Sequence, residues 1–303
     1  MQEKTAMYWS KGDGGSVRCG LCPHRCQIAE SASGLCGARE NLGGELIASG
    51  YGAVSSVALD PIEKKPLYMF HPGKQVLSIG GYGCNLRCRF CQNYEISTAG
   101  RDGTGTGAGK RAREARGLEP GERLAPGDIA KLAVQTVPEG NIGVAYTYNE
   151  PLIGYEFLRD CAGLVRGEGL CNVVVTNGYI CEEPLEELLP LIDAMNIDLK
   201  GFTGAFYEKV GGDLETVKKT IAMAREKCHV EVTTLVIPGE NEDDVEGIAK
   251  WLAAIDPGMP LHLSRFFPRY LYSGRSPTPR ETILRLRDVA KAHLKNVFAG
   301  NMW

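Results

Sequence analysis

The chain of 303 residues is long enough to bury a large hydrophobic core, as one α/β domain or as two smaller ones. Its net charge of −3 and isoelectric point near 6.0 provide no long-range attraction for nucleic acids or anionic membranes. No apolar run reaches the length of a membrane-spanning helix, and the N-terminus lacks the apolar core of a signal peptide. A cytoplasmic protein is therefore expected.

Seven of the eleven cysteines fall in two tight groups. In a large chain without an export signal, this pattern predicts metal ligation in a reducing compartment rather than disulfide bonds. The remaining four are expected to be ordinary buried thiols: Cys161, Cys171, Cys181 and Cys228.

The N-terminal group is a complete set of four thiols on a segment too short to form its own core: Cys19, Cys22, Cys26 and Cys36. We expect residues 1–45 to form a metal-binding segment, because ligation would supply folding free energy. Structural zinc is the first choice, and an auxiliary iron–sulfur cluster stays open because both accept four thiolates. His24 is expected outside the ligand set.

The rest of the chain, residues 46–303, alternates apolar β-branched runs with amphipathic stretches. This alternation predicts parallel strands joined by right-handed crossovers. Residues 100–118 are rich in Gly, Arg and Lys and are expected to form a mobile loop. "TPRE" predicts a final helix with Thr278 as N-cap and Glu281 completing a capping box. The predicted strands are 76–80, 141–148, 172–176, 195–199, 230–237, 261–267 and 296–301, and helices are expected at 127–137, 154–169, 213–228 and 243–255.

The second cysteine group lies in "GYGCNLRCRFCQN", which places Cys84, Cys88 and Cys91 within eight residues and supplies no nearby fourth cysteine. Thiolates select zinc, copper(I) or iron–sulfur clusters. A structural zinc site normally takes a closed set of four ligands. The open set is what a four-iron cluster with one iron left for substrate requires.

Polar side chains also follow the predicted strands. In a partial barrel, functional groups collect at these carboxyl ends, whereas a doubly wound sheet gathers ligands at one switch point. Candidates at all the strand ends therefore favour an α/β fold of the partial (β/α)6 barrel type. Some of these candidates also have a plain structural interpretation: Asn177 before Gly178 as a turn, Asp198 with Lys200 as a surface ion pair, and Arg265 as a structural arginine. The candidates are Asn149, Glu150, Thr176, Asn177, Asp198, Lys200 and Arg265.

The loop "CNLRCRFC", with Phe90 before the third cysteine, resembles the signature of radical S-adenosylmethionine (SAM) enzymes. The resemblance implies that Cys84, Cys88 and Cys91 hold a [4Fe–4S] cluster whose fourth iron chelates the amino and carboxylate groups of SAM. It further implies reductive cleavage of SAM to methionine and a 5′-deoxyadenosyl radical, which abstracts a hydrogen atom from substrate.

The same resemblance implies roles at the strand ends. Glu150, after Asn149, accepts hydrogen bonds from the SAM amine. By their own chemistry, Thr176 and Asn177 are expected to bond the ribose or carboxylate of SAM, and Asp198 and Lys200 to hold its methionine carboxylate. The backbone from Val236 to Gly239 is expected to lie along the adenine, and Arg265 to face the substrate.

Further motifs point to a branch of this family. "TYNEP", "TNG", "DLKG" and "PGEN" together resemble pyruvate formate-lyase activating enzymes. "CGLCPHRC", "KPLYMFHPG" and "RFFPRY" resemble the radical SAM member of the AmmeMemoRadiSam system, which is named for Memo-like and AMME-region companions. Two features depart from these relatives. Val175 stands where activating enzymes often have an acidic residue that is used in a cation site. Relatives in the AmmeMemoRadiSam group often carry a cysteine-containing tail after "GN", whereas this sequence reads only Met302 and Trp303 after it.

The expected function is hydrogen abstraction from a protein, a small molecule or RNA, with a flavodoxin or ferredoxin as low-potential reductant. A glycyl-radical-enzyme activase is the alternative within the class. A non-enzymatic iron–sulfur electron carrier and a zinc-binding module are the alternatives outside it. If the protein is an electron carrier, it should still work after loss of Glu150 or Asn177. If it is a zinc-binding module, it should contain two zinc ions and no iron.

Overall fold

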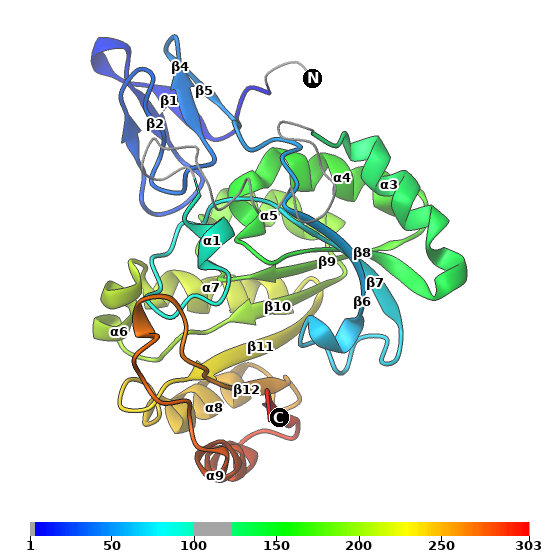
Figure 1. Cartoon of the computed structure of the whole chain (residues 1–303), viewed down its shortest axis with the longest axis vertical. Coiled ribbons are helices and arrows are strands. Elements are labelled where there is room, and N and C mark those ends of the chain that lie inside the picture. Colours follow the sequence, from blue (N-terminus) through cyan, green and yellow to red (C-terminus); the bar gives the residue numbers. More distant parts are fainter. Residues whose placement is uncertain (1–3, 100–122, 303) are drawn as a thin grey trace.

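An eight-stranded sheet forms the centre of the computed structural model, which describes residues 4–99 and 123–302 (Figure 1). The predicted loop 100–118 lies outside the described residues. Seven strands are parallel, and the eighth, β6, pairs antiparallel with β7 at one edge. From that edge the strands are β6 (Ser56–Pro61), β7 (Gln75–Gly80), β8 (Asn141–Thr147), β9 (Cys171–Thr176), β10 (Ala194–Asp198), β11 (His229–Val236), β12 (Leu261–Arg265) and β13 (Val297–Gly300).

Neighbouring strands in this sheet are also neighbours along the chain, and the order never reverses. Right-handed crossovers in one direction place every connecting helix on the same face, as in a barrel, whereas a doubly wound sheet reverses at a switch point. The predicted α/β fold with a mostly parallel sheet is thus confirmed. The helices are α1 (Tyr94–Ser97), α3 (Pro126–Gln135), α4 (Tyr155–Gly167), α5 (Glu182–Leu188), α6 (Gly204–Val210), α7 (Leu214–Arg225), α8 (Asp244–Ile255) and α9 (Arg280–Lys291).

Strand β6, the N-terminal strands and helices α1, α5 and α6 were not among the predicted elements. Strand β6 mixes polar and apolar residues and ends in a proline, so it lacks the apolar run that marks the central strands. The N-terminal segment forms two small antiparallel sheets above the central sheet (Figure 1). Their strands are β1 (Trp9–Lys11), β2 (Val17–Cys19), β3 (Gln27–Ile28), β4 (Glu40–Leu42) and β5 (Glu45–Ile47).

The predicted capping box of the last helix is wrong. Helix α9 begins at Arg280, Pro279 occupies the N-cap position, and no side chain caps the helix. The Thr278 hydroxyl instead donates to the Val236 carbonyl at 2.6 Å and accepts from the Phe266 amide at 3.3 Å. Thr278 therefore ties the end of β11 to the segment after β12.

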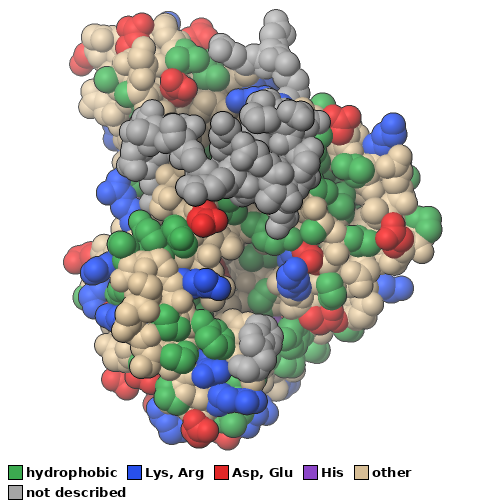
Figure 2. Space-filling view, in the orientation of Figure 1, with side chains coloured by type: hydrophobic (Ala, Val, Ile, Leu, Met, Phe, Trp, Pro, Cys, Tyr) green, Lys and Arg blue, Asp and Glu red, His purple; other side chains and the backbone are tan. Residues whose placement is uncertain are grey.

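A small cluster of buried apolar side chains lies on the sheet: Val76, Ala145, Val173 and Ala194 pack against Ile62 and Leu67. Beside them the buried Glu231 carboxylate accepts from the Tyr68 and Met69 amides at 3.0 and 2.7 Å. It also contacts His229 and His262 at 2.9 and 2.6 Å. The 62–70 segment is thus held against the sheet by apolar packing and by hydrogen bonds to Glu231. In the space-filling view the molecule is hollowed near the centre of the face drawn (Figure 2).

Glu231 is expected to make stability depend on acid pH. Burial raises its pKa, but hydrogen bonds from His229, His262 and Met69 outweigh burial and lower the pKa to about 2. Because the folded-state pKa lies below that of the unfolded chain, the carboxylate stabilises the fold above about pH 4.5 by about 3 kcal/mol. This contribution is lost as pH falls through about 2. Urea unfolding between pH 2 and 6 should show that the difference in free energy of unfolding between wild type and Glu231→Gln becomes smaller toward pH 2. A difference that does not change with pH would refute this role of Glu231.

Candidate active site

The cysteine loop follows β7 and is held by backbone contacts. Gly83 has φ +86°, and a Cβ there would lie 2.3 Å from the Cys36 carbonyl oxygen, so only glycine fits. The Asn149 side chain accepts from the Gly81 amide at 2.8 Å and donates to the Gly83 carbonyl at 3.1 Å. The amide group of Asn149 is therefore used in shaping this loop.

A buried carboxylate joins three strand ends. Glu150, 2 % exposed, accepts from the Thr176 hydroxyl and the Asn177 backbone amide, both at 2.7 Å. Asn177 in turn donates from its side chain to Asn85 Oδ1 at 2.9 Å, and its Nδ2 lies 3.6 Å from Cys84 Sγ. The ends of β8 and β9 thus meet the cysteine loop that follows β7.

Burial raises the pKa of Glu150 to about 7, although its hydrogen bonds act in the opposite direction. A buried acid in this condition favours a cation beside it, because a positive charge offsets the loss of solvation. Glu150 is consequently suited to receive an ammonium group.

The end of β10 brings an ion pair to the same region. Lys200 Nζ lies 2.6 Å from Asp198 Oδ2, with side chains 16 % and 31 % exposed. Burial lowers the pKa of Lys200, but Asp198, Cys88 and Cys91 together raise it above its usual range. The Asp198–Lys200 ion pair thus stands at the end of the strand that follows β9 in the sheet.

Four predicted residues have other surroundings. Phe90 is buried and packs against Phe206 and Tyr272, with ring centroids 6.3 and 5.9 Å away, so it anchors the cysteine loop to the core. The other three residues contact Thr278, Glu242 and Phe267. These are Val236, whose carbonyl accepts from Thr278; Gly239, whose amide donates to Glu242; and Arg265, which donates to the Thr278 carbonyl and lies over Phe267.

Sequence reasoning missed Asn85, which lies between the first two cysteines of the loop. Its side chain donates to the Tyr179 carbonyl at 2.6 Å, and its own carbonyl lies 2.7 Å from His24 Nε2. Asn85 therefore connects the cysteine loop both to the segment after β9 and to the N-terminal segment. An asparagine inside a loop carries no sequence signal of such contacts.

Comparison with known families agrees with this arrangement. Residues 78–252, which run from β7 into α8, match the radical SAM superfamily. The chain belongs to the radical SAM superfamily. The expected radical SAM enzyme is thereby confirmed, and with it the [4Fe–4S] cluster and SAM as the cofactors of the family.

Individual relatives extend the match. The uncharacterized protein MJ0808 of Methanocaldococcus jannaschii is 41 % identical over 99 % of this chain and 85 % of its own length. Pyruvate formate-lyase 1-activating enzyme of Escherichia coli is 25 % identical over 54 % of this chain and 61 % of its own length. A radical SAM methyltransferase from Sphaerobacter thermophilus, 15 % identical over 76 % of this chain and 67 % of its own, shares the fold with a TM-score of 0.52.

The residues of the loop fit a radical SAM cluster by their chemistry. The Leu86 amide lies 3.3 Å from Cys84 Sγ, and the Asn177 side-chain amide lies 3.6 Å from the same sulfur. Such donors favour thiolates, the form that binds iron. In residues 4–99 and 123–302, no group of three or more His, Cys, Asp or Glu side chains has metal-binding geometry.

The four N-terminal thiols line one small cavity together with Arg39, which is 1 % exposed. Arg39 forms an ion pair with Glu156 of α4, donates to the Met7 carbonyl at 2.8 Å, and lies 3.7 Å from Cys19 Sγ. Arg39 Nε and Glu156 Oε2 are buried and have no hydrogen-bond partner among the described residues. Burial raises the pKa of Cys22 to about 12. Burial also raises the pKa of Cys36, although the nearby Arg39 charge acts to lower it.

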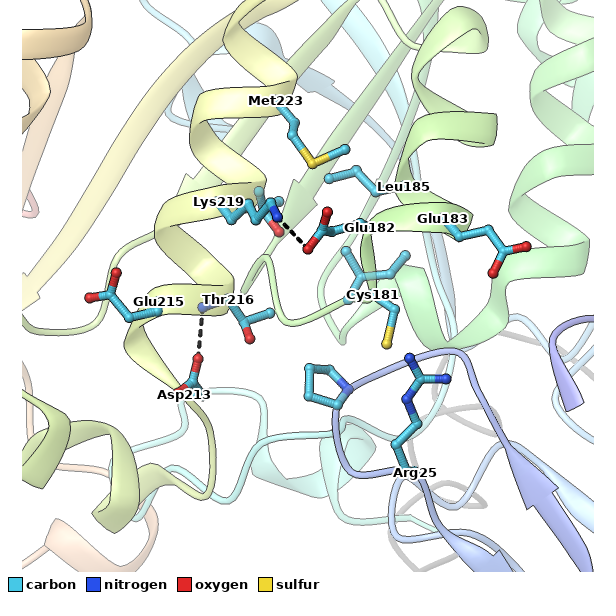
Figure 3. A pocket seen from close by; sticks show the side chains of 13 residues that line it. Arg25, Cys181, Glu182, Glu183, Leu185, Asp213, Glu215, Thr216, Lys219 and Met223 are labelled. Atoms are coloured by element: carbon cyan, nitrogen blue, oxygen red, sulfur yellow. Dashed lines mark hydrogen bonds and ion pairs between the residues drawn. The ribbon is translucent and has the colours of Figure 1, made fainter.

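A larger groove, of about 600 Å³, lies against the helices rather than beside Glu150. Pro23 and Arg25 of the N-terminal segment face α5 and α7 across it, and the Cys181 thiol points toward Arg25 (Figure 3). A Glu182–Lys219 ion pair of 2.5 Å crosses its wall. No residue of the cysteine loop lines this groove. Of the helices that the structure describes, none combines the length and apolar character needed to cross a membrane.

Proposed function

We propose that Cys84, Cys88 and Cys91 hold the cluster and that Glu150 receives the SAM amine. The observation that carries this assignment is the hydrogen-bonded chain from Cys84 through Asn177 to Glu150, which joins the cysteine loop to the ends of β8 and β9. When bound, the reduced cluster supplies the electron that cleaves the S–C5′ bond of SAM and so yields the hydrogen-abstracting radical.

The protein residues act by binding, orientation and charge. Glu150 is held by three donors, from Thr176, Asn177 and Leu152, so its carboxylate is fixed before a ligand arrives. The Asp198–Lys200 pair places a cation where the methionine carboxylate is proposed to lie. Behind the cysteine loop, the Phe90 ring packs against Phe206 and Tyr272. These rings exclude water from that side of the loop.

We further propose a protein substrate, because the activating enzyme of E. coli is named for a protein partner, pyruvate formate-lyase. A glycyl residue of a partner enzyme is the alternative that this relative favours. The motifs shared with the AmmeMemoRadiSam branch make Memo-like and AMME-region proteins the first partners to test. A low-potential electron donor is also required, since the cluster must be reduced before SAM is cleaved.

The assignment is tested by anaerobic reconstitution with iron and sulfide, followed by dithionite and SAM. Wild type should form 5′-deoxyadenosine, and Cys88→Ala should form none because a cluster ligand is missing. Cys228→Ala is the matched control, since this half-buried thiol lies outside both groups, and it should retain activity. Equal product from Cys88→Ala and wild type would overturn the assignment.

For the N-terminal thiols we propose one structural metal, with zinc as the first choice. The supporting observations are their shared cavity and the buried Arg39 cation, which offsets the negative charge of metal-bound thiolates. Elemental analysis of anaerobically purified protein should find about one zinc per chain in wild type and in Cys88→Ala. Cys22→Ser/Cys36→Ser should lose that zinc but keep the cluster iron. Retention of zinc by this double variant would contradict the site. Iron in place of zinc at these thiols in wild type would instead identify an auxiliary cluster.

A further inference from the structure

Four exposed cationic side chains lie near the outer side of the cysteine loop. Arg87 and Arg89 belong to the loop, and Lys209 and Arg275 come from α6 and from the segment after η6 (Tyr270–Tyr272). Leu271, within η6, is 58 % exposed and is the most exposed large hydrophobic residue in the part of the chain that is described. We call these five residues the cationic patch.

Tyr272 holds the patch together. Its ring packs on Phe90 of the cysteine loop, with Arg89 and Arg275 at 5.5 and 3.8 Å from the ring centroid. Tyr270 stacks on Tyr94, just after the loop, at 4.8 Å. The rings on either side of Leu271 therefore pack inward, which fixes η6 against the cysteine loop and leaves Leu271 exposed.

Contacts with α6 complete the patch. The Arg87 amide donates to the Val210 carbonyl at 2.7 Å, and the Arg87 side chain runs beside Gly211. Lys209 and Arg275 both bind Glu240, at 2.9 and 2.6 Å. The cationic patch is thus a connected surface built from three separate segments of the chain.

The charge of the patch is opposite to that of the whole chain. Glu240 is the carboxylate that its members bind, and its side chain is only 9 % exposed. Arg87 and Arg89 form no ion pair within the described residues, although Glu208 is exposed next to Lys209 in sequence. A chain with a net charge of −3 therefore presents a positive surface beside the loop that carries the three thiols.

We propose that the cationic patch is the docking surface for an acidic electron-carrier protein. This inference rests on the proposed cluster at Cys84, Cys88 and Cys91. The carrier gives up one electron and is oxidised, and the cluster accepts that electron and is reduced, with no proton or group transferred. A small apolar centre at Leu271 with a cationic rim suits a transient complex, whose interface buries less than about 1,200 Å². Complementary charge steers such encounters and weakens with salt.

The test measures binding and activity separately. Oxidised flavodoxin is titrated by calorimetry against wild type, Arg87→Gln/Arg89→Gln and the control Arg285→Gln/Lys291→Gln, which removes two exposed cations from α9. The patch variant should bind roughly tenfold more weakly at low salt, and the control should bind like wild type. Binding should also weaken as salt rises.

The activity assay compares reduced flavodoxin with dithionite as electron donor. The patch variant should form less 5′-deoxyadenosine with flavodoxin and the wild-type amount with dithionite. Three results would overturn the docking surface. The patch variant could bind flavodoxin as tightly as wild type, the control could lose as much affinity as the patch variant, or wild type could fail to bind flavodoxin. Absence of product from wild type with dithionite would instead refute the proposed function, and the calorimetric comparison would still decide whether the patch binds the carrier.

Discussion

Arg39→Met is expected to lower the free energy of unfolding by about 3–5 kcal/mol, because it leaves Glu156 charged and buried without its partner. Both side chains are 1 % exposed, and Glu156 also accepts from the Met7 amide at 2.7 Å. The pair joins the N-terminal segment to α4. Loss of Arg39 also removes the cation beside Cys19, so the N-terminal metal should be held more weakly.

Urea unfolding under anaerobic conditions measures the effect. The control is Arg39→Met/Glu156→Leu, which removes both charges and keeps apolar volume; replacing a buried ion pair in this way is often neutral or stabilising. The double variant should therefore recover most of the stability lost by the single variant. Equal stability of Arg39→Met and wild type would show that the ion pair does not hold the N-terminal segment to the helices.

Glu150→Gln is expected to reduce SAM cleavage by about a hundredfold or more, because the amide carries no charge for the SAM amine and loses one acceptor. In the wild type one carboxylate oxygen accepts from Thr176 and Leu152, and the other from the Asn177 amide. A glutamine NH₂ in place of either oxygen would face donors. Anaerobic assay of 5′-deoxyadenosine over a range of SAM concentrations measures the loss.

Glu183→Gln, on the exposed start of α5, is the matched control and should cleave SAM at the wild-type rate. Circular dichroism and iron content separate a local effect from unfolding or loss of the cluster. If Glu150→Gln is folded, binds iron and cleaves SAM at the wild-type rate, Glu150 does not receive the SAM amine.

The central sheet was predictable because its strands carry a strong local signal. The runs "VLSIG", "NVVVT" and "VEVTTLVI" are continuous and β-branched, and they correspond to β7, β9 and β11. The small N-terminal strands have two or three residues each, which is too short for any periodicity to be detected. Their positions depend on contacts between residues far apart in the sequence, such as the bridge between Thr5 and Ile47.

The site residues also differ in how far the sequence could identify them. Glu150, Thr176 and Asn177 were identifiable because polar groups directly after apolar strands must lie at one end of a parallel sheet. Asn85 and the Thr278 hydroxyl were not, because their partners are distant in sequence: Asn85 contacts Tyr179 and His24, and Thr278 contacts Val236. Residue type alone cannot say which of several hydrogen-bonding roles an asparagine or a threonine adopts in the fold.

The most direct test of the central claim is electron paramagnetic resonance of the anaerobically reconstituted, dithionite-reduced protein, recorded with and without SAM. Three thiolates leave one iron open, so wild type should show the signal of a reduced [4Fe–4S] cluster, and SAM should change that signal by binding the open iron. A protein that retains stoichiometric zinc and no iron, or a cluster signal that SAM does not alter, would contradict the account.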